Sequence, residues 1–202
     1  WLRGQLGGVD GMMQVSYKSP DGWAFYQLQQ KISQIWGSDS ALLRSAVLCW
    51  AKSGGDLESE HMKALRPYVL VYRDTPAGWI CVEVGEQSFY SKWWGWAEAR
   101  SSIGRSLGEF PGGEEFAKIV DVPYREVQIS HSLRLDQVIT RIPRVPGGAP
   151  LPVCFERLLM GSRMPDGSFA LVIVVDRAEK IAVSGLDQTW LDDMPADVKV
   201  DF

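Results

Sequence analysis

Residues 169–175 read FALVIVV, a run of seven apolar residues without a polar member. Because none of them favours contact with water, the run is typical of a central strand that is covered on both faces. It is far shorter than the about 20 residues that a membrane-spanning helix needs. Pro165, Asp166 and Gly167 favour a tight turn just before it, since proline presets φ and glycine accepts a left-handed conformation. The chain must therefore build a sheet that buries this strand.

Four further segments are rich in β-branched and aromatic residues, as strands usually are. They are residues 68–72, 79–84, 135–145 and 151–161. The turn over 74–78 is short, which favours an antiparallel hairpin over a parallel crossover. Two early and three late strands with helices between them predict an α+β fold with one five-stranded antiparallel sheet.

Two or three helices are predicted ahead of the first strand. Residues 22–36 have apolar residues at helical spacing and read as an amphipathic helix. A second helix follows a cap at Ser38, Asp39 or Ser40 and is closed by the glycines at 54–55. A short third stretch covers residues 57–65.

Short helices are predicted between the early and the late strands, so that they flank the sheet. Residues 88–98 form the first and residues 114–120 the second. Asp121 is expected to cap a third helix, which begins at Val122 and Pro123 because proline is favoured in a first turn. This helix reaches about His131.

The chain divides into four parts on these patterns. Residues 1–20 are rich in glycine and read as a flexible arm. Residues 21–65 form the N-terminal helical segment and residues 66–178 the sheet domain. Residues 179–202 form an acidic C-terminal tail that is expected to dock partly on the body. The sequence leaves the order of the arm and the tail open.

Composition narrows the possible partners. The 202 residues include 25 acidic and 21 basic ones, for a net charge of −4. This balance argues against nucleic acid as a partner, because such a binder needs a concentrated basic face. No membrane partner is expected either. The cysteines at 49, 81 and 154 lie far apart in apolar segments, which predicts buried free thiols and a cytoplasmic location.

Four places in the chain together resemble a PAS domain. The first is LRPYVLVY at 65–72 leading into GWICVEVG at 78–85, and the second is WGWA at 94–97 followed by GRSLGEF at 104–110. The third is Phe116 with YREV at 124–127, and the fourth is FERLLM at 155–160 with the turn at 166–167 and the strand at 169–176. Their order is similar to that of divergent, stand-alone bacterial PAS proteins with a leading helical segment.

The resemblance spans about residues 60–177 and rests on diffuse apolar patterns. It implies a five-stranded antiparallel sheet flanked by short helices, used for sensing or protein association rather than catalysis. The flavin-binding motif of light-sensing PAS domains surrounds none of the cysteines. Haem-binding PAS sensors carry their proximal histidine late in the helix before the third strand, where His131 falls. A helix-end histidine that favours the helix dipole is the alternative.

Metal and catalytic signatures are missing from the sequence. Two histidines, His61 and His131, make a multi-histidine metal site improbable. No phosphate-binding glycine motif and no nucleophile elbow is present. The protein is therefore predicted not to be an enzyme, and no cofactor is expected. The rival hypothesis is a cone-shaped α+β enzyme in which Glu83 or Glu156 acts as general base.

A ligand pocket is predicted from the resemblance. Trp93, Trp94 and Trp96 fall in the segment with which PAS domains wall their pocket, and Tyr124 lies in the matched helix. These aromatic residues either shape a pocket for a planar or apolar ligand or pack as core.

Arg157 is the preferred anion-binding residue among the arginines on or beside the late strands, which are Arg134, Arg141, Arg144 and Arg157. Apolar neighbours surround it, so its guanidinium needs a partner such as Glu83 or the carboxylate or phosphate of a ligand. The alternative places these arginines at a solvated sheet edge.

The leading amphipathic helix offers a dimerisation surface. Its apolar stripe consists of Trp23, Phe25, Leu28, Ile32, Ile35 and Trp36. Together these features predict a cytoplasmic PAS-like sensory or signalling domain that binds a small ligand or a protein partner and forms a homodimer. Its output is an interaction with another protein in trans. The alternative is a structural adaptor with a filled core.

Overall fold

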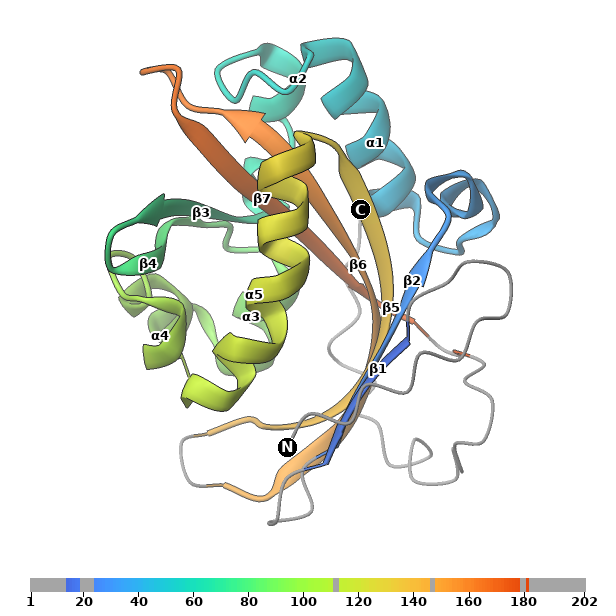
Figure 1. The fold of residues 1–202 in the computed structure, drawn as a ribbon, viewed down its shortest axis with the longest axis vertical. Coiled ribbons are helices and arrows are strands. Elements are labelled where there is room, and N and C mark those ends of the chain that lie inside the picture. Colours follow the sequence, from blue (N-terminus) through green and yellow to red (C-terminus); the bar gives the residue numbers. More distant parts are fainter. Residues whose placement is uncertain (1–13, 19–23, 111–112, 146–147, 179–180, 182–202) are drawn as a thin grey trace.

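The computed structural model describes residues 14–18, 24–110, 113–145, 148–178 and 181. Within this part of the chain, seven strands form one antiparallel sheet that curves around a group of helices, as Figure 1 shows. The strand order is β1-β2-β5-β6-β7-β3-β4. The predicted α+β class is therefore confirmed.

The five predicted strands lie next to one another in the order β4-β3-β7-β6-β5. Two more strands, β1 and β2, extend the sheet beyond β5, so the predicted number of five is too low. The bounds are β1 Gln14–Lys18, β2 Ala24–Gln30, β3 Val69–Thr75, β4 Gly78–Val84, β5 Leu133–Pro143, β6 Pro150–Arg163 and β7 Phe169–Arg177.

Helices cover both faces of this sheet (Figure 1). On one face lie α1 (Ala41–Ser53) and α2 (Glu60–Lys63), with α1 against β7. On the other face lie α3 (Phe89–Trp94), α4 (Trp96–Ser101) and α5 (Gly113–Ser130), with α3 and α5 against β7. The 3-10 helices are η1 (Ile32–Gly37), η2 (Arg66–Tyr68) and η3 (Leu107–Glu109).

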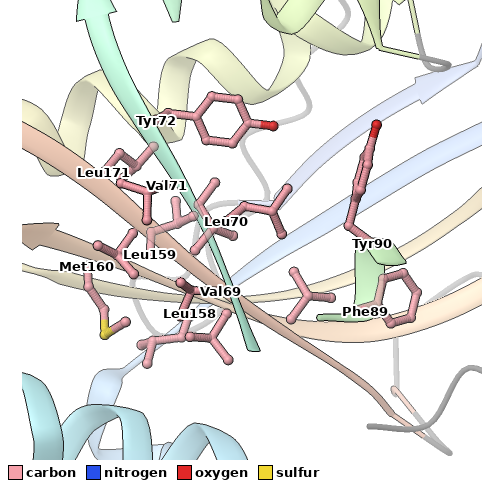
Figure 2. Close-up of a cluster of buried hydrophobic side chains, with 14 of the residues drawn as sticks. Val69, Leu70, Val71, Tyr72, Phe89, Tyr90, Leu158, Leu159, Met160 and Leu171 are labelled. Atoms are coloured by element: carbon pink, nitrogen blue, oxygen red, sulfur yellow. The ribbon is translucent and has the colours of Figure 1, made fainter. Parts of the chain in front are cut away.

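Strand β7 is the centre of the core, as its apolar sequence predicts. It lies between β6 and β3, and residues 170–176 are all buried. Figure 2 shows Leu171 with the neighbouring side chains of β3 and β6, and Phe89 and Tyr90 of α3 beside them. Because α1 covers one face and α3 and α5 cover the other, apolar residues are favoured at every position of the strand.

The predicted helix over residues 22–36 is wrong. Residues 24–30 form β2, which pairs with β5 in the register Phe25↔Thr140, and η1 follows. The segment fits a strand as well, since its alternate positions Phe25 and Gln27 are both buried. Pairing with β5 decides in favour of the strand. It gives hydrogen-bond partners to the backbone N–H and C=O groups along the outer edge of β5, which is long and buried.

The predicted flexible arm over residues 1–20 also needs correction. Residues 14–18 form β1, which pairs with β2. The rest of the arm lies outside the described residues, as does most of the predicted tail. Of residues 179–202, only Ile181 is described, and it packs against Ile139 and Cys154.

Two helix predictions in the middle of the chain are corrected by packing. A single helix, α5, runs through Pro123, so Asp121 lies inside it and caps nothing. One continuous face of the helix is buried, with Val120, Tyr124 and Val127 along it. The free energy gained by burying this face outweighs the cost of the backbone hydrogen bond that proline removes. The helix predicted over 88–98 divides into α3 and α4 at Gly95, whose φ of 86° is a left-handed conformation.

Helix α1 forms as its local sequence predicts. The Ser40 hydroxyl accepts a hydrogen bond from the Leu43 N–H, which identifies the cap among the three candidates. Gly54 ends the helix with a φ of 60°. The stretch predicted over 57–65 is helical over a shorter range, as α2.

Candidate functional site

A cavity of about 80 Å³ lies between the sheet and the helices α3 and α5. Its floor comes from β3, β5, β6 and β7, and its other walls come from α3, α5 and the segment around η3. The lining consists of Leu70, Tyr72, Phe89, Tyr90, Trp94, Leu107, Phe110, Phe116, Tyr124, Ile142, Phe155, Arg157, Ile173 and Val175. This lining is almost entirely apolar and aromatic, which is the usual character of a small-molecule site.

Rings fix the shape of the cavity. Tyr72 lies between Phe110 and Tyr124, with centroid separations of 5.8 and 6.0 Å. Tyr90 packs against Trp94 at 4.4 Å, and its hydroxyl is 2.9 Å from the Ser102 hydroxyl. Such contacts within the range for aromatic pairs favour a rigid wall.

The lining phenols are neutral at physiological pH. Burial raises the pKa of Tyr124 to about 12, although the nearby Arg157 guanidinium acts in the opposite direction. Burial also raises the pKa of Tyr72 well above its ordinary value and raises that of Tyr90. The three phenols therefore bring no negative charge to the cavity, since the charged form is disfavoured where water is excluded.

Arg157 carries the one formal charge among the lining residues. It extends from β6, and its side chain is only 4% exposed. Its Nη2 donates to Asp136 Oδ2 at 2.9 Å and to Gln27 Oε1 at 2.8 Å. Its Nε is buried and has no hydrogen-bond partner in the described part of the chain. The guanidinium lies 5.7 Å from the centre of the Tyr124 ring, a cation–π contact.

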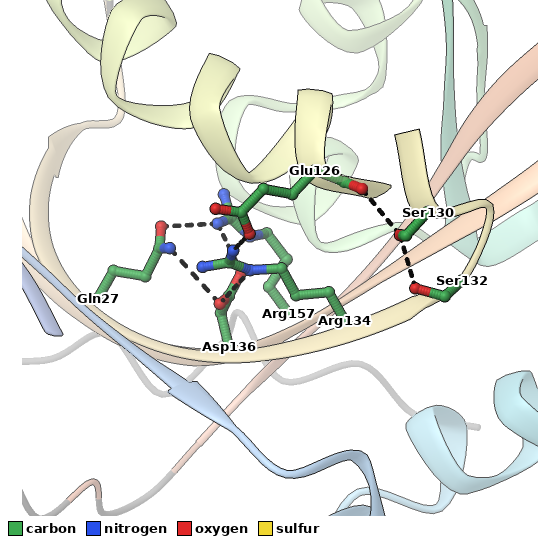
Figure 3. Close-up of polar contacts among 7 residues, drawn as sticks. All are labelled: Gln27, Glu126, Ser130, Ser132, Arg134, Asp136 and Arg157. Atoms are coloured by element: carbon green, nitrogen blue, oxygen red, sulfur yellow. Dashed lines mark hydrogen bonds and ion pairs between the residues drawn. The ribbon is translucent and has the colours of Figure 1, made fainter. Parts of the chain in front are cut away.

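Asp136 joins Arg157 to a second buried arginine, as Figure 3 shows. Arg134 Nε donates to Asp136 Oδ1 at 2.9 Å, and Arg134 Nη1 donates to Glu126. Asp136 is fully buried, whereas the Glu126 side chain is 44% exposed. The buried part of this cluster therefore contains two positive charges and one negative charge. The second negative charge, on Glu126, is partly exposed to solvent.

The alternation of β5 explains the cluster. Arg134 and Asp136 lie two residues apart, so both project from the face that α5 covers. The β5–β6 register places Asp136 directly opposite Arg157, and the β2–β5 register brings Gln27 beside them. Sequence reasoning missed Asp136 and Gln27, and the one signal that points to Asp136 is a carboxylate inside a predicted strand.

Three of the six predicted ligand residues line the cavity: Trp94, Tyr124 and Arg157. Trp93 is buried next to it, where it stacks on Phe89 and donates from Nε1 to the Pro143 carbonyl at 3.3 Å. Trp96 lies on α4, outside the lining, and is 43% exposed. Trp93 therefore acts as core, which was the alternative reading of these residues.

His131 also lies outside the cavity. It follows α5 with a φ of 49°, is exposed, and contacts the Phe169 ring edge-on. No histidine is among the lining residues, and a cavity of about 80 Å³ holds only a few water-sized volumes. The residues present therefore do not fit a haem group.

Two expectations for the arginines are corrected. Arg134 and Arg157 are buried rather than placed at a solvated sheet edge. The partner of Arg157 is Asp136 and not Glu83, whose carboxylate lies 3.7 Å from Arg66. Among the others, Arg144 stacks over the Trp93 ring, with 5.4 Å between the guanidinium carbon and the ring centre.

The two carboxylates of the enzyme hypothesis lie away from the cavity. Glu83 is on β4, and burial raises its pKa although Arg66 opposes the shift. Glu156 accepts hydrogen bonds from the Ser38 hydroxyl and from Gln137 Nε2, in a polar groove. Within the described residues neither carboxylate pairs with a histidine, and neither is among the residues that line the cavity.

The predicted dimerisation residues separate into two groups. Phe25 and Ile35 are fully buried, and Leu28 is half-buried. Ile32 and Trp36, both in η1, remain 38% and 54% exposed. Trp23 lies outside the described residues. The stripe is therefore not a single free helix face, and among its described members the η1 residues expose the most apolar surface.

No family model, curated protein or solved structure matches this chain. In the described ranges, no three His, Cys, Asp or Glu residues gather as a metal site would require. None of the described helices has both the length and the apolar character to cross a membrane. The geometry of the cavity and its buried arginine therefore remains the basis for a functional hypothesis.

Proposed function

We propose that this protein is a non-enzymatic, PAS-like sensory domain whose cavity binds a small molecule. The observation that carries the proposal is the apolar cavity with one buried guanidinium in its wall. In support, the two early and three late strands are neighbours in one antiparallel sheet, and the tryptophan-bearing segment lies across its curved face. This is the arrangement that the sequence resemblance to PAS domains implies.

The cavity walls provide a route from binding to output. Phe89, Tyr90 and Trp94 of α3 line the cavity, and α4 follows directly after Gly95. A ligand that binds better when α3 is displaced shifts the population toward that conformation. Two large apolar side chains are exposed here, those of Trp96 in α4 and of Ile103 just after it. The same displacement therefore moves apolar surface that a partner protein can recognise in trans.

We propose a homodimer through the exposed η1 residues Ile32 and Trp36. Large apolar side chains that are exposed on the same short helix favour association, because their burial removes apolar surface from water. A cytoplasmic location is part of the proposal. Three cysteines that form no disulfide in the described structure, two of them buried, are consistent with a reducing compartment.

Thermal unfolding with small apolar probes tests the ligand-binding function. We expect n-butanol and similar four-carbon molecules to raise the Tm of the wild type, since ligands that bind only the folded state stabilise it. The variant Leu70→Phe fills part of the cavity and is expected to abolish the shift. As a matched control, Leu48→Phe adds the same volume at an exposed position and leaves the shift unchanged.

A structural adaptor with a filled core is the second candidate. The small volume of the cavity favours it, since many domains contain a void of this size without a ligand. Absence of any Tm shift in the wild type, together with a higher Tm for Leu70→Phe, supports the adaptor and contradicts the sensor.

A further inference from the structure

The buried donors around the cavity call for a hydrogen-bond acceptor. Arg157 lines the cavity, and its Nε is buried without a partner in the described part of the chain. Arg134 Nη2, in the same cluster, is also buried and unpartnered within those residues. A buried donor left without an acceptor is costly, so such groups in native proteins usually bond to protein, water or ligand.

The chemistry of the unpartnered donor favours an anion as this acceptor, because a guanidinium forms its strongest hydrogen bonds with ionised groups. Two guanidiniums, those of Arg134 and Arg157, are buried with one buried carboxylate, that of Asp136. Glu126 compensates the second guanidinium from a position that is 44% exposed. Neither an acidic side chain nor an ionised phenol lines the cavity, so nothing in the lining repels an anion that reaches Arg157. Buried charges are stabilised when they are paired and hydrogen-bonded.

The remaining lining sets the size and polarity of the rest of the ligand. Leu70, Ile173 and Val175 form an aliphatic floor next to Arg157, and aromatic rings form the other walls. An engineered cavity that accepts benzene has about 150 Å³, so the about 80 Å³ found here suits a ligand of about three to five non-hydrogen atoms in all, fewer than benzene has.

We propose that the cavity selects a short-chain aliphatic monocarboxylate, with its carboxylate against Arg157 Nε and its hydrocarbon chain among the apolar walls. This inference rests on the proposed sensory function and adds the class of ligand to it. The guanidinium lies over the ring of Tyr124, which also lines the cavity.

Calorimetric titration of the wild type with propionate, propionamide and n-propanol tests the proposal. The three probes share a chain length and differ in the group that meets Arg157. We expect propionate to bind about ten-fold or more tightly than propionamide, because hydrogen bonds to charged groups are the stronger ones. We also expect octanoate to bind more weakly than propionate, since its chain exceeds the volume available.

Variants place the binding at Arg157. Arg157→Met removes the guanidinium and is expected to abolish the preference for propionate over propionamide. Arg157→Lys retains the charge without the Nε donor, and we expect it to retain part of the preference. The control Arg73→Met changes an arginine that pairs with Asp166 away from the cavity, and it leaves the preference unchanged.

An NMR measurement on the wild type does not depend on whether these variants fold. The Nε–H signal of Arg157, assigned by its loss in Arg157→Lys or through its own side-chain resonances, is expected to shift with propionate and not with n-propanol. Equal binding of all three probes overturns the carboxylate proposal and leaves the sensory function standing. Failure of all three probes to bind overturns both, whereas n-propanol binding without propionate binding overturns only the carboxylate proposal.

Discussion

Arg157 of β6 and Asp136 of β5 face each other across neighbouring strands, with 2.9 Å between Nη2 and Oδ2, and both side chains are buried. The pair connects the sheet to the cavity. Arg157 lines the cavity, and Asp136 and Gln27 both accept hydrogen bonds from its guanidinium. A buried ion pair of this kind adds little stability by itself, but loss of one partner leaves an uncompensated charge.

Asp136→Asn is therefore expected to lower the free energy of unfolding by about 3–5 kcal/mol, since it leaves Arg134 and Arg157 buried without a carboxylate between them. Urea unfolding followed by tryptophan fluorescence measures the change. Glu60→Gln serves as the control because its pair with Lys63 is exposed, and a change of about 1 kcal/mol or less is expected there. Equal effects of the two substitutions contradict the role given to Asp136.

The cysteines are expected to differ in reactivity. Burial raises the pKa of Cys81 and of Cys154 to about 12, from an ordinary value of 9.0, so both remain protonated at pH 8. The thiolate is the nucleophile, and both side chains are buried from reagents. Burial also raises the pKa of Cys49, but its side chain is accessible.

Iodoacetamide labelling at pH 8, followed by peptide mass spectrometry, checks this order. We expect Cys49 to be labelled first in the native protein, and all three to be labelled at similar rates in urea. Because the folded-state pKa of the two buried thiols is raised, their contribution to stability is present below pH 9 and is lost as the pH rises toward 12. Rapid native labelling of Cys81 is the result that contradicts its burial.

The proposed dimer predicts a clear effect of two exposed residues. Ile32→Ser together with Trp36→Ser is expected to reduce the mass measured by light scattering at micromolar concentration to that of a monomer. Both side chains are partly exposed, so the fold is expected to persist, which circular dichroism checks. The matched control is Ile129→Ser, which removes an exposed apolar side chain from α5. An unchanged mass for the double variant removes η1 from the proposed interface.

Trp94 and Tyr124 could be found from the sequence because each lies in a segment that resembles PAS domains. Arg157 could be found because its neighbours in a predicted strand are apolar. Asp136 and Gln27 could not, since each becomes relevant only through strand register. Gln27 lies 109 residues before Asp136 along the chain, and their side chains meet only because β2 pairs with β5. His131 and Trp96 were predicted from their positions in the sequence, which do not specify where their side chains point.

The sequence by itself determined the features that depend on neighbours along the chain. The apolar run in β7 required burial on both faces, Ser40 and Gly54 delimited α1, and the short turns made antiparallel hairpins. Only the tertiary structure decided that residues 24–30 are a strand, that α5 continues through Pro123, and that Arg157 has Asp136 as its partner. In each case a contact between distant segments outweighs a small local preference, because hydrogen-bond pairing and the burial of a continuous face involve larger free energies than propensity.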